Sequence, residues 1–390
     1  MLPNYYEFYC PVKIVSGNQA LSNLPYEMDQ LGAHKALIVT DPGVVAAGLL
    51  KPVQAAFEGS NCAIGAVFDQ TPVDSSNLVC NQVAKIFNEK GCDCLVALGG
   101  GSAIDTAKGA NIVVSEKTDD LLKFQGHECV KETLKPFIVI PTTSGTGSEA
   151  TLVAVIANVE KNIKMSFTSN KLYPHVAILD PKMLVTMPKK ITAATGMDAL
   201  THAIEAFVNL QKNPMSDAFA ITTVKLVHEN LVRAVENGSD EKARLAMANA
   251  ALCGGIAFSN SLVGIVHAIA HACGGVAHLP HGVANAILLP WGLEYNLDTS
   301  AETIAELAPW IGAPAAGSAA EKARAVIAAV RELTKKLNEL SGLPLTLKEA
   351  GLKEEQFPAI AKAAINDGTM NYNPKDATLE EVIAILKKAY

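Results

Sequence analysis

The chain contains 390 residues, and its 32 Lys and Arg residues against 39 Asp and Glu residues give a formal net charge of −7. A sequence of this length fits two domains or one large one. Because it has no dense basic segment, it lacks a surface that would neutralise the phosphates of a nucleic acid or an anionic membrane. Hydrophobic residues make up 49% of the chain, which excludes a disordered protein and is enough for a sizeable core.

Secreted and membrane-spanning proteins are also disfavoured. The eight cysteines include no C-x-x-C pair, which is typical of reduced thiols in a cytoplasmic protein. The N-terminal residues lack the basic start and apolar run of a signal peptide. Residues 245–293 contain no Asp, Glu, Lys or Arg, but four histidines and the breaks at Gly254, Gly274 and Pro280 argue against a membrane span.

Short apolar or β-branched runs alternate with segments of helical spacing through the first half of the chain. Strands are expected at residues 36–40, 63–68, 94–98, 137–140 and 176–179. This alternation is typical of a parallel sheet covered by helices. A further β-rich patch, residues 152–157 and 165–168, predicts a hairpin added to that sheet.

After Pro188 the β-rich runs nearly disappear, and helical periodicity takes over. Helices are expected at residues 191–210, 215–230, 240–257, 262–274 and 319–340. The change of pattern predicts a boundary near residue 185. Residues 1–185 are therefore predicted to form an α/β domain of nucleotide-binding type, and residues 186–390 an all-α domain.

The first chemical signal is a glycine-rich turn, Gly99-Gly100-Gly101-Ser102, at the end of an expected strand. Glycines allow the backbone to approach a phosphate, and the free N–H groups of a following helix point at the anion. Ile104 stands where the dinucleotide fingerprint G-x-G-x-x-G requires a further glycine. The turn alone is therefore equally compatible with an ordinary strand–helix connection.

A second loop, residues 141–151 (PTTSGTGSEAT), follows another expected strand and is rich in hydroxyl groups and glycine. Ligands of parallel α/β sheets lie beyond the carboxyl ends of the strands, so the two loops together favour a nucleotide site. Asp41 follows a third strand, where a carboxylate can bind the ribose 2′-hydroxyl and disfavour a 2′-phosphate. The same residue is also compatible with a simple Asp-Pro-Gly turn.

The helical half concentrates potential metal ligands. They are Asp198, His202, His267, His271, His278 and His281. Asp198 and His202 are four residues apart and share one helix face, and His267 and His271 repeat that spacing. Carboxylate and imidazole groups on helices otherwise empty of charge favour a divalent metal site. Spacing does not identify the ligands, because His267 with His271 is the simplest pair and His278 is a further candidate.

Four segments resemble the iron-containing (group III) alcohol dehydrogenase family. They are GGGSAIDTAK at 99–108, PTTSGTGSEAT at 141–151, GMDALTHAIEA at 196–206 and GIVHAIAHACGGVAHLPHGVANA at 264–286. The resemblance covers essentially the whole chain, and the last two segments are highly specific. It implies a Rossmann-like parallel sheet with an added hairpin in a dinucleotide-binding α/β domain, residues 1–185. An all-α metal-binding and catalytic domain, residues 186–390, would follow, in the architecture of dehydroquinate synthase.

The resemblance also implies roles for individual residues. A metal, usually iron(II) and in some members zinc(II), would be bound by Asp198, His202, His267 and His281. His271 would face the nicotinamide and relay the proton, whereas His278 would have no functional role. The residues implied for NAD are Asp41, Gly99, Gly100, Gly101, Ser102, Thr142, Thr143, Ser144, Thr146 and Lys164. Those implied for the substrate pocket are Val153, Phe258 and Thr369.

The implied function is that of an NAD-dependent alcohol dehydrogenase or aldehyde reductase acting on a small primary alcohol, diol or aldehyde. Ethanol, butanol, lactaldehyde and 1,3-propanediol all fit. The alternative is a dehydroquinate synthase-like or glycerol dehydrogenase-like metalloenzyme of the same fold. A phosphorylated sugar acid would need Lys and Arg beside the metal, and residues 245–293 offer none. A non-catalytic protein of this fold would have a damaged ligand set, whereas all four residues are present.

The expected partner is a small-molecule substrate, and neither a nucleic acid nor a membrane is expected. The N-terminal segment, residues 5–15, could add an edge strand to a neighbouring copy. A homodimer or a higher homo-oligomer is therefore expected.

Overall fold

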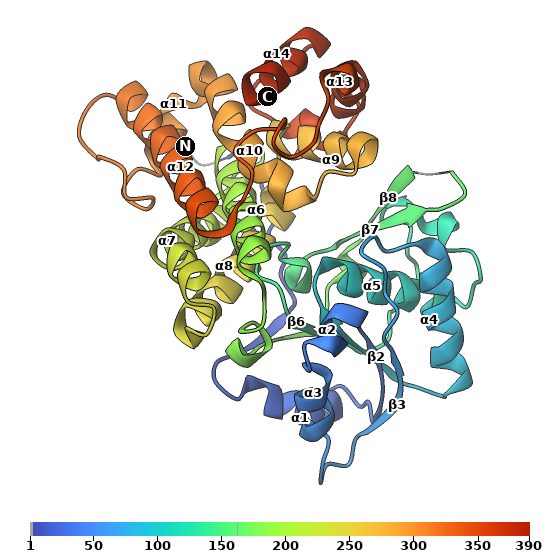
Figure 1. Cartoon of the computed structure of the whole chain (residues 1–390). Coiled ribbons are helices and arrows are strands. Elements are labelled where there is room, and N and C mark those ends of the chain that lie inside the picture. The colour runs from blue at the N-terminus through green and yellow to red at the C-terminus, as the bar shows by residue number, and fades with distance from the viewer. Residues whose placement is uncertain (1–2, 162) are drawn as a thin grey trace. The chain divides into compact units, whose positions relative to one another are not determined.

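The computed structural model describes residues 3–161 and 163–390 and divides into two units (Figure 1). One unit comprises Cys10–Thr186, and the other comprises Met187–Tyr390 together with the described residues up to Tyr9. The first unit contains the strands and the second is helical. The N-terminal residues are tied to the helical unit by the backbone N–H of Tyr9, which donates to Oδ1 of Asn260 at 2.7 Å.

A six-stranded parallel sheet forms the centre of the α/β unit, with the strand order β1-β9-β6-β4-β2-β3. The strands are β1 Lys13–Ser16, β2 Lys35–Val39, β3 Ala63–Phe68, β4 Cys94–Gly99, β6 Phe137–Pro141 and β9 Val176–Leu179. β4 and β6 are buried along their whole length, as continuous apolar strands between two helical layers must be. The predicted parallel sheet is confirmed.

Helices cover both faces of this sheet. They are α1 Leu24–Gln30, α2 Pro42–Ala46, α3 Leu50–Ala56, α4 Asn77–Glu89 and α5 Gly101–Ser115. Leu95 and Ala97 of β4 join an apolar cluster with α4 and α5. Val96 and Leu98 join a second cluster with α1 and α3, because successive side chains of a strand point to opposite faces.

The predicted hairpin is present as β7 Val153–Asn158 and β8 Ile163–Thr168, which pair antiparallel. It does not extend the six-stranded sheet, because it forms a separate three-stranded sheet with β5 Gly126–His127. The reason lies in the packing of β7. Its inward residues Ala154 and Ile156 join the apolar cluster of α4 and α5, so the hairpin covers those helices instead of adding to the sheet edge.

Strand β1 comes from the N-terminal segment that was expected to meet a neighbouring copy. It pairs with β9 of its own chain, with Lys13 opposite Val176, and is an edge strand of the sheet. An edge strand has a second side that can pair. The expected pairing with another copy therefore stays a prediction.

The helical unit confirms the all-α expectation. Its helices are α6 Lys189–Val208, α7 Pro214–Glu236, α8 Glu241–Ser261, α9 Ile265–Ala277, α10 His281–Tyr295, α11 Leu297–Ala305, α12 Ala319–Ser341, α13 Phe357–Ile365 and α14 Leu379–Ala389. Glycines allow these helices to approach closely. A Cβ on Gly196 would lie 2.3 Å from Leu231, and one on Gly292 would lie 2.3 Å from Val266.

Among the described residues, no single helix has the length and apolar character that crossing a membrane requires. The pair α8 and α9 satisfies the criteria together, by length and composition alone, and is bent by 104° at the break between them. No disulfide links the cysteines of the described chain.

Candidate metal centre and cofactor loops

Three helices of the helical unit bring four of the predicted ligands together. α6 carries Asp198 and His202, α9 carries His267, and α10 begins with His281. Each residue offers one ligand atom, and these atoms all lie within 4.8 Å of one another. Asp198, His202 and His267 are buried, whereas 38% of the His281 side chain is exposed. The cluster is therefore accessible on the side of His281.

Local sequence explains how the cluster is assembled. Asp198 and His202 project from one face of α6, as residues four apart on a helix do. Gly282 lets the start of α10 approach α6, because a Cβ there would lie 2.6 Å from the backbone oxygen of Ala194. This close approach brings Nε2 of His281 to 3.4 Å from Oδ1 of Asp198.

The charge states within the cluster suit a cation. Burial alone would raise the pKa of Asp198, but the three imidazoles and a hydrogen bond from Asn285 outweigh burial and lower it. Burial holds the pKa of His267 well below its usual value. Neutral imidazole and ionised carboxylate are the forms that bind metal.

Glu205 supports the cluster, although the sequence analysis did not identify it. Its carboxylate lies at the N-terminus of α9 and accepts the backbone N–H groups of Val266 at 2.7 Å and His267 at 3.2 Å. It also lies 2.6 Å from Nδ1 of His267, which leaves Nε2 of that ring for a ligand. Burial raises the pKa of Glu205 to about 7, although the backbone N–H groups act against the rise. Its spacing from Asp198 and His202 on one face of α6 could have identified it.

The donor set fits a divalent cation. Nδ2 of Asn285 lies 2.6 Å from Oδ1 of Asp198, 3.2 Å from Nε2 of His267 and 3.1 Å from Nε2 of His281. An amide nitrogen has two hydrogens, so it serves at most two of these three acceptors. One carboxylate and three imidazoles that converge in this way suit iron(II) or zinc(II).

His271 lies beside the cluster without being one of the four convergent residues. Its ring stacks on that of His281 with centroids 5.3 Å apart, and its Nδ1 lies 2.9 Å from Oδ2 of Asp367. Asp367 also accepts hydrogen bonds from the backbone N–H and the hydroxyl of Thr369, at 2.9 and 2.8 Å. Asp367 was not predicted, because no local pattern connects it to a histidine 96 residues away. His278 ends α9 in the left-handed conformation, with φ 54°, and is not part of the cluster.

The three residues expected to line the substrate pocket are divided between the units. Phe258 stacks on His202 with ring centroids 4.4 Å apart, so it lies directly beside the cluster. Thr369 is connected to His271 through Asp367. Val153 begins β7 in the α/β unit.

The structure brings together most of the residues expected to bind NAD. β4 ends at Gly99, and α5 begins at Gly101. A Cβ on Gly100 would lie 3.1 Å from Thr143, and one on Gly101 would lie 3.1 Å from Thr146. The two predicted loops therefore touch at positions where a Cβ would be crowded by the threonine side chains.

Asp41 lies at the same end of the sheet. Its Oδ1 caps α2 by accepting the backbone N–H of Val44 at 3.0 Å. A Cβ on Gly99 would lie 3.3 Å from its Oδ2. The cap shows that Asp41 stabilises the turn before α2, and its position beside the glycine turn leaves ribose binding as a prediction.

The remaining cofactor candidates have identified neighbours. The backbone N–H of Thr142 donates to the carbonyl of Gly99 at 3.0 Å, and Ser102 donates its hydroxyl hydrogen to the carbonyl of Val73. Ser144 is buried, and its hydroxyl has no hydrogen-bond partner among the described residues. Nζ of Lys164 forms an ion pair with Oδ1 of Asp74 at 2.8 Å. Asp74 was not predicted.

The buried Lys108 and the partly buried Asp105 connect the second loop to α5. Nζ of Lys108 donates to the carbonyls of Thr151 and Val153, at 2.9 and 2.8 Å. Asp105 accepts from the hydroxyl of Ser148 at 2.9 Å and from the backbone N–H of Val155 at 3.0 Å. Burial lowers the pKa of Lys108 to about 8. Asp105 and Lys108, in the second half of the segment GGGSAIDTAK, therefore position the loop of residues 141–151. The sequence analysis did not predict this structural role.

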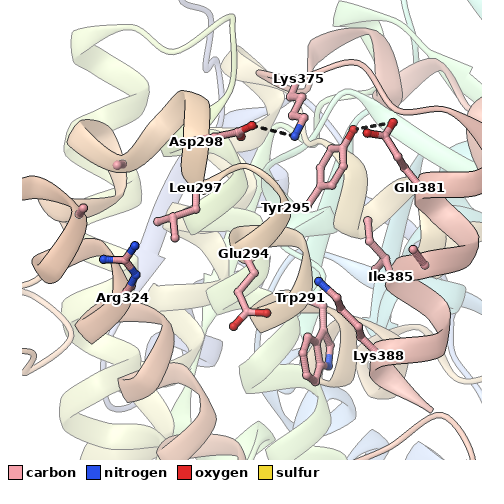
Figure 2. A pocket seen from close by; sticks show the side chains of 13 residues that line it. Trp291, Glu294, Tyr295, Leu297, Asp298, Arg324, Lys375, Glu381, Ile385 and Lys388 are labelled. Carbon is pink, nitrogen blue, oxygen red and sulfur yellow. Dashed lines mark hydrogen bonds and ion pairs between the residues drawn. The ribbon is translucent and has the colours of Figure 1, made fainter.

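A separate hollow of about 720 Å³ lies among α10, α11, α12 and α14 (Figure 2). Trp291 and Tyr295 line it, with an ion pair of 2.9 Å between Lys375 and Asp298. The hydroxyl of Tyr295 donates to Glu381 at 3.2 Å. The hollow contains none of the residues predicted for metal, cofactor or substrate, and these polar side chains pair with one another.

Comparisons with known proteins agree with this geometry. The family model described as iron-containing alcohol dehydrogenase matches residues 11–181, and the C-terminal model of the Fe-containing alcohol dehydrogenase family matches residues 192–390. An NAD-dependent methanol dehydrogenase from Bacillus methanolicus is 38% identical over 98% of this chain and 99% of the relative. A 1,3-propanediol dehydrogenase from Klebsiella pneumoniae is 36% identical over 99% of each. A solved 1,3-propanediol oxidoreductase matches with a TM-score of 0.95 at 36% identity, covering 99% of this chain and 100% of that one.

Proposed function

Because the chain belongs to the family of iron-containing alcohol dehydrogenases, we propose that it transfers a hydride between NAD(H) and a small primary alcohol, diol or aldehyde. The observation that carries the proposal is the convergence of four ligand atoms within 4.8 Å. A non-catalytic protein would have no need of a buried carboxylate held among imidazoles, because such a group is costly to bury without a cation.

The helical unit supplies the groups that act on the substrate oxygen. When bound, a divalent cation polarises that oxygen and NAD accepts the hydride. Asp198, His202, His267 and His281 hold the cation. His271 exchanges the hydroxyl proton at Nε2, because its Nδ1 is engaged by Asp367.

The α/β unit binds the cofactor. The glycine turn after β4 and the hydroxyl-rich loop after β6 bind the pyrophosphate and ribose, and Asp41 selects NAD over NADP. Lys164 binds a ribose hydroxyl, with Asp74 orienting its ammonium group. The residues assigned to NAD are Asp41, Gly99, Gly100, Gly101, Ser102, Thr142, Thr143, Ser144, Thr146 and Lys164.

The substrate is small and largely uncharged. Phe258 contacts His202 and offers an apolar wall, and with Thr369 and Val153 it is assigned to the pocket. The similar proteins from Bacillus methanolicus and Klebsiella pneumoniae are named for methanol and 1,3-propanediol, which supports this size class. Iron(II) is the proposed metal, with zinc(II) as the alternative.

A cytoplasmic location and a homodimer or higher homo-oligomer complete the proposal. The location is supported by cysteines that form no disulfide in the described chain. The oligomer is supported by β1, an edge strand with a side available for pairing.

The test combines metal analysis with an activity screen. Protein purified without oxygen should contain about one equivalent of iron or zinc per chain. Short alcohols should then yield NADH, and short aldehydes should consume it. Chelation should abolish turnover, and one of the two metals should restore it. If metal-stripped protein oxidised primary alcohols at the full rate, the proposal would be overturned.

A further inference from the structure

Asn285 lies at the point that three of the assigned metal ligands face. It is fully buried, one turn after His281 on α10. Its Nδ2 is 2.6 Å from Oδ1 of Asp198, 3.2 Å from Nε2 of His267 and 3.1 Å from Nε2 of His281. Nδ2 of Asn285 therefore lies within hydrogen-bonding distance of ligand atoms on α6, α9 and α10.

The orientation of the Asn285 amide is determined by its neighbours. An ionised carboxylate only accepts hydrogen bonds, so the NH₂ group must face Asp198. In the tautomer of His267 that donates its Nδ1 hydrogen to Glu205, Nε2 is also an acceptor. With the amide turned round, Oδ1 would face acceptors only. As it stands, Oδ1 is buried and has no hydrogen-bond partner among the described residues.

We infer that Asn285 is a positioning residue for the metal, and this inference rests on the proposed function. Its N–H group holds Oδ1 of Asp198 in the rotamer that points at the cation. The second hydrogen of the NH₂ group faces Nε2 of either His267 or His281 and favours the tautomer in which that ring directs its Nε2 lone pair inward. Asn285 and Glu205 thus act on opposite sides of His267, one at Nε2 and the other at Nδ1.

The chemistry of asparagine suits this role better than that of its closest substitutes. Leucine has a similar volume but no donor, so the buried carboxylate of Asp198 would lose a hydrogen bond. Aspartate would place a second carboxylate against the first, and only a bound cation would relieve their repulsion. Mutation of a residue that orients metal ligands in this way typically lowers metal affinity by about 10–100-fold.

The experiment compares metal affinity in the full-length wild type, N285L and the control N230L. Asn230 is a buried amide on α7 that donates to the carbonyl of Leu226 at 2.9 Å. Iron(II) and zinc(II) are titrated separately into the stripped protein against a chromogenic chelator, without oxygen. N285L should raise the Kd of both metals by about 10–100-fold. N230L should stay within about twofold of the wild type. A wild-type Kd in N285L would overturn the inference.

A second variant keeps the test decisive if N285L does not fold. N285D should lower the Tm of the stripped protein, because Asp198 then faces another carboxylate. Saturating zinc(II) should raise the Tm of N285D by more than it raises that of the wild type. An equal or smaller metal-induced shift would contradict the role of Asn285. A wild type that binds neither metal would instead overturn the proposed function.

Discussion

Oδ2 of Asp367 lies 2.9 Å from Nδ1 of His271, although 96 residues separate them in the chain. Burial alone would raise the pKa of Asp367, but the hydrogen bonds from His271 and Thr369 outweigh burial and lower it. The carboxylate therefore stays ionised at neutral pH and accepts the Nδ1 hydrogen. In the proposed mechanism, Asp367 would fix the His271 ring so that Nε2 is left for proton exchange.

D367N should reduce kcat for alcohol oxidation by about 10–100-fold, because the amide no longer specifies which nitrogen of His271 carries the hydrogen. The KM for NAD should stay near the wild-type value, since the assigned cofactor residues lie in the α/β unit. Steady-state kinetics with saturating metal measure both constants. D298N is the control, because Asp298 is an exposed carboxylate paired with Lys375. Equal kcat values for D367N and D298N would contradict the role.

Removing one assigned ligand should release the metal. H202A deletes a buried imidazole whose ring stacks on His267 at a centroid distance of 4.5 Å. Metal affinity should fall by at least about 100-fold, and turnover should fall with metal content. Elemental analysis after gel filtration gives the metal content, and an NADH-linked assay gives the turnover.

The matched control replaces a histidine of the same region that lies outside the cluster. His278 has a φ of 54°, and asparagine tolerates that conformation, so H278N should keep the backbone intact. H278N should retain the wild-type metal content. If H278N lost as much metal as H202A, the loss of metal in H202A would reflect damage to the fold. It would then give no evidence that His202 is a ligand.

The fold was largely predictable because its strands and helices carry periodic patterns. The expected strands 63–68 and 176–179 coincide with β3 and β9. Their apolar runs are what a sheet covered on both faces requires. The separate sheet of the hairpin was not predictable, because its third strand, β5, has only two residues and carries no period.

Residue spacing pointed to the site only where its residues are neighbours on one helix, and only the family resemblance grouped His267 and His281 with Asp198 and His202. Asp198 and His202 share a face of α6, and the same spacing extends to Glu205. Asn285 follows His281 by one turn, but an amide is not a typical ligand of iron or zinc, so nothing marked it. Asp367 reaches His271 only through the tertiary fold, and no short-range pattern encodes that contact.

D41S should relax the preference for NAD over NADP. If the carboxylate beside Gly99 binds the ribose as proposed, it would repel a 2′-phosphate, and serine removes the charge. The ratio of kcat/KM for NADP to that for NAD should rise by about tenfold or more, which corresponds to about 1.4 kcal/mol. Serine can still cap α2 by accepting the backbone N–H of Val44, so this variant separates the two roles of Asp41.

The Tm of D41S should therefore stay close to that of the wild type, whereas D41G loses both charge and cap. Both variants should show the same change in coenzyme preference if the charge alone selects the cofactor. An unchanged preference in both would remove Asp41 from coenzyme selection and leave it only the capping role.

Glu149 should make the protein less stable as the pH rises towards neutrality. It is buried, and its Oε1 has no hydrogen-bond partner in the described chain. Burial raises its pKa from 4.5 to about 7. Between these values the folded protein holds a proton that the unfolded chain has lost, so the stabilisation present below pH 4.5 disappears as the pH passes 7. The folded state loses about 3 kcal/mol of stability over this pH range.

E149Q cannot ionise, so its Tm advantage over the wild type should be larger at pH 8 than at pH 5. E89Q, which changes an exposed carboxylate at the end of α4, should show no such growth. An E149Q advantage of equal size at both pH values would mean that Glu149 keeps an ordinary pKa in the fold.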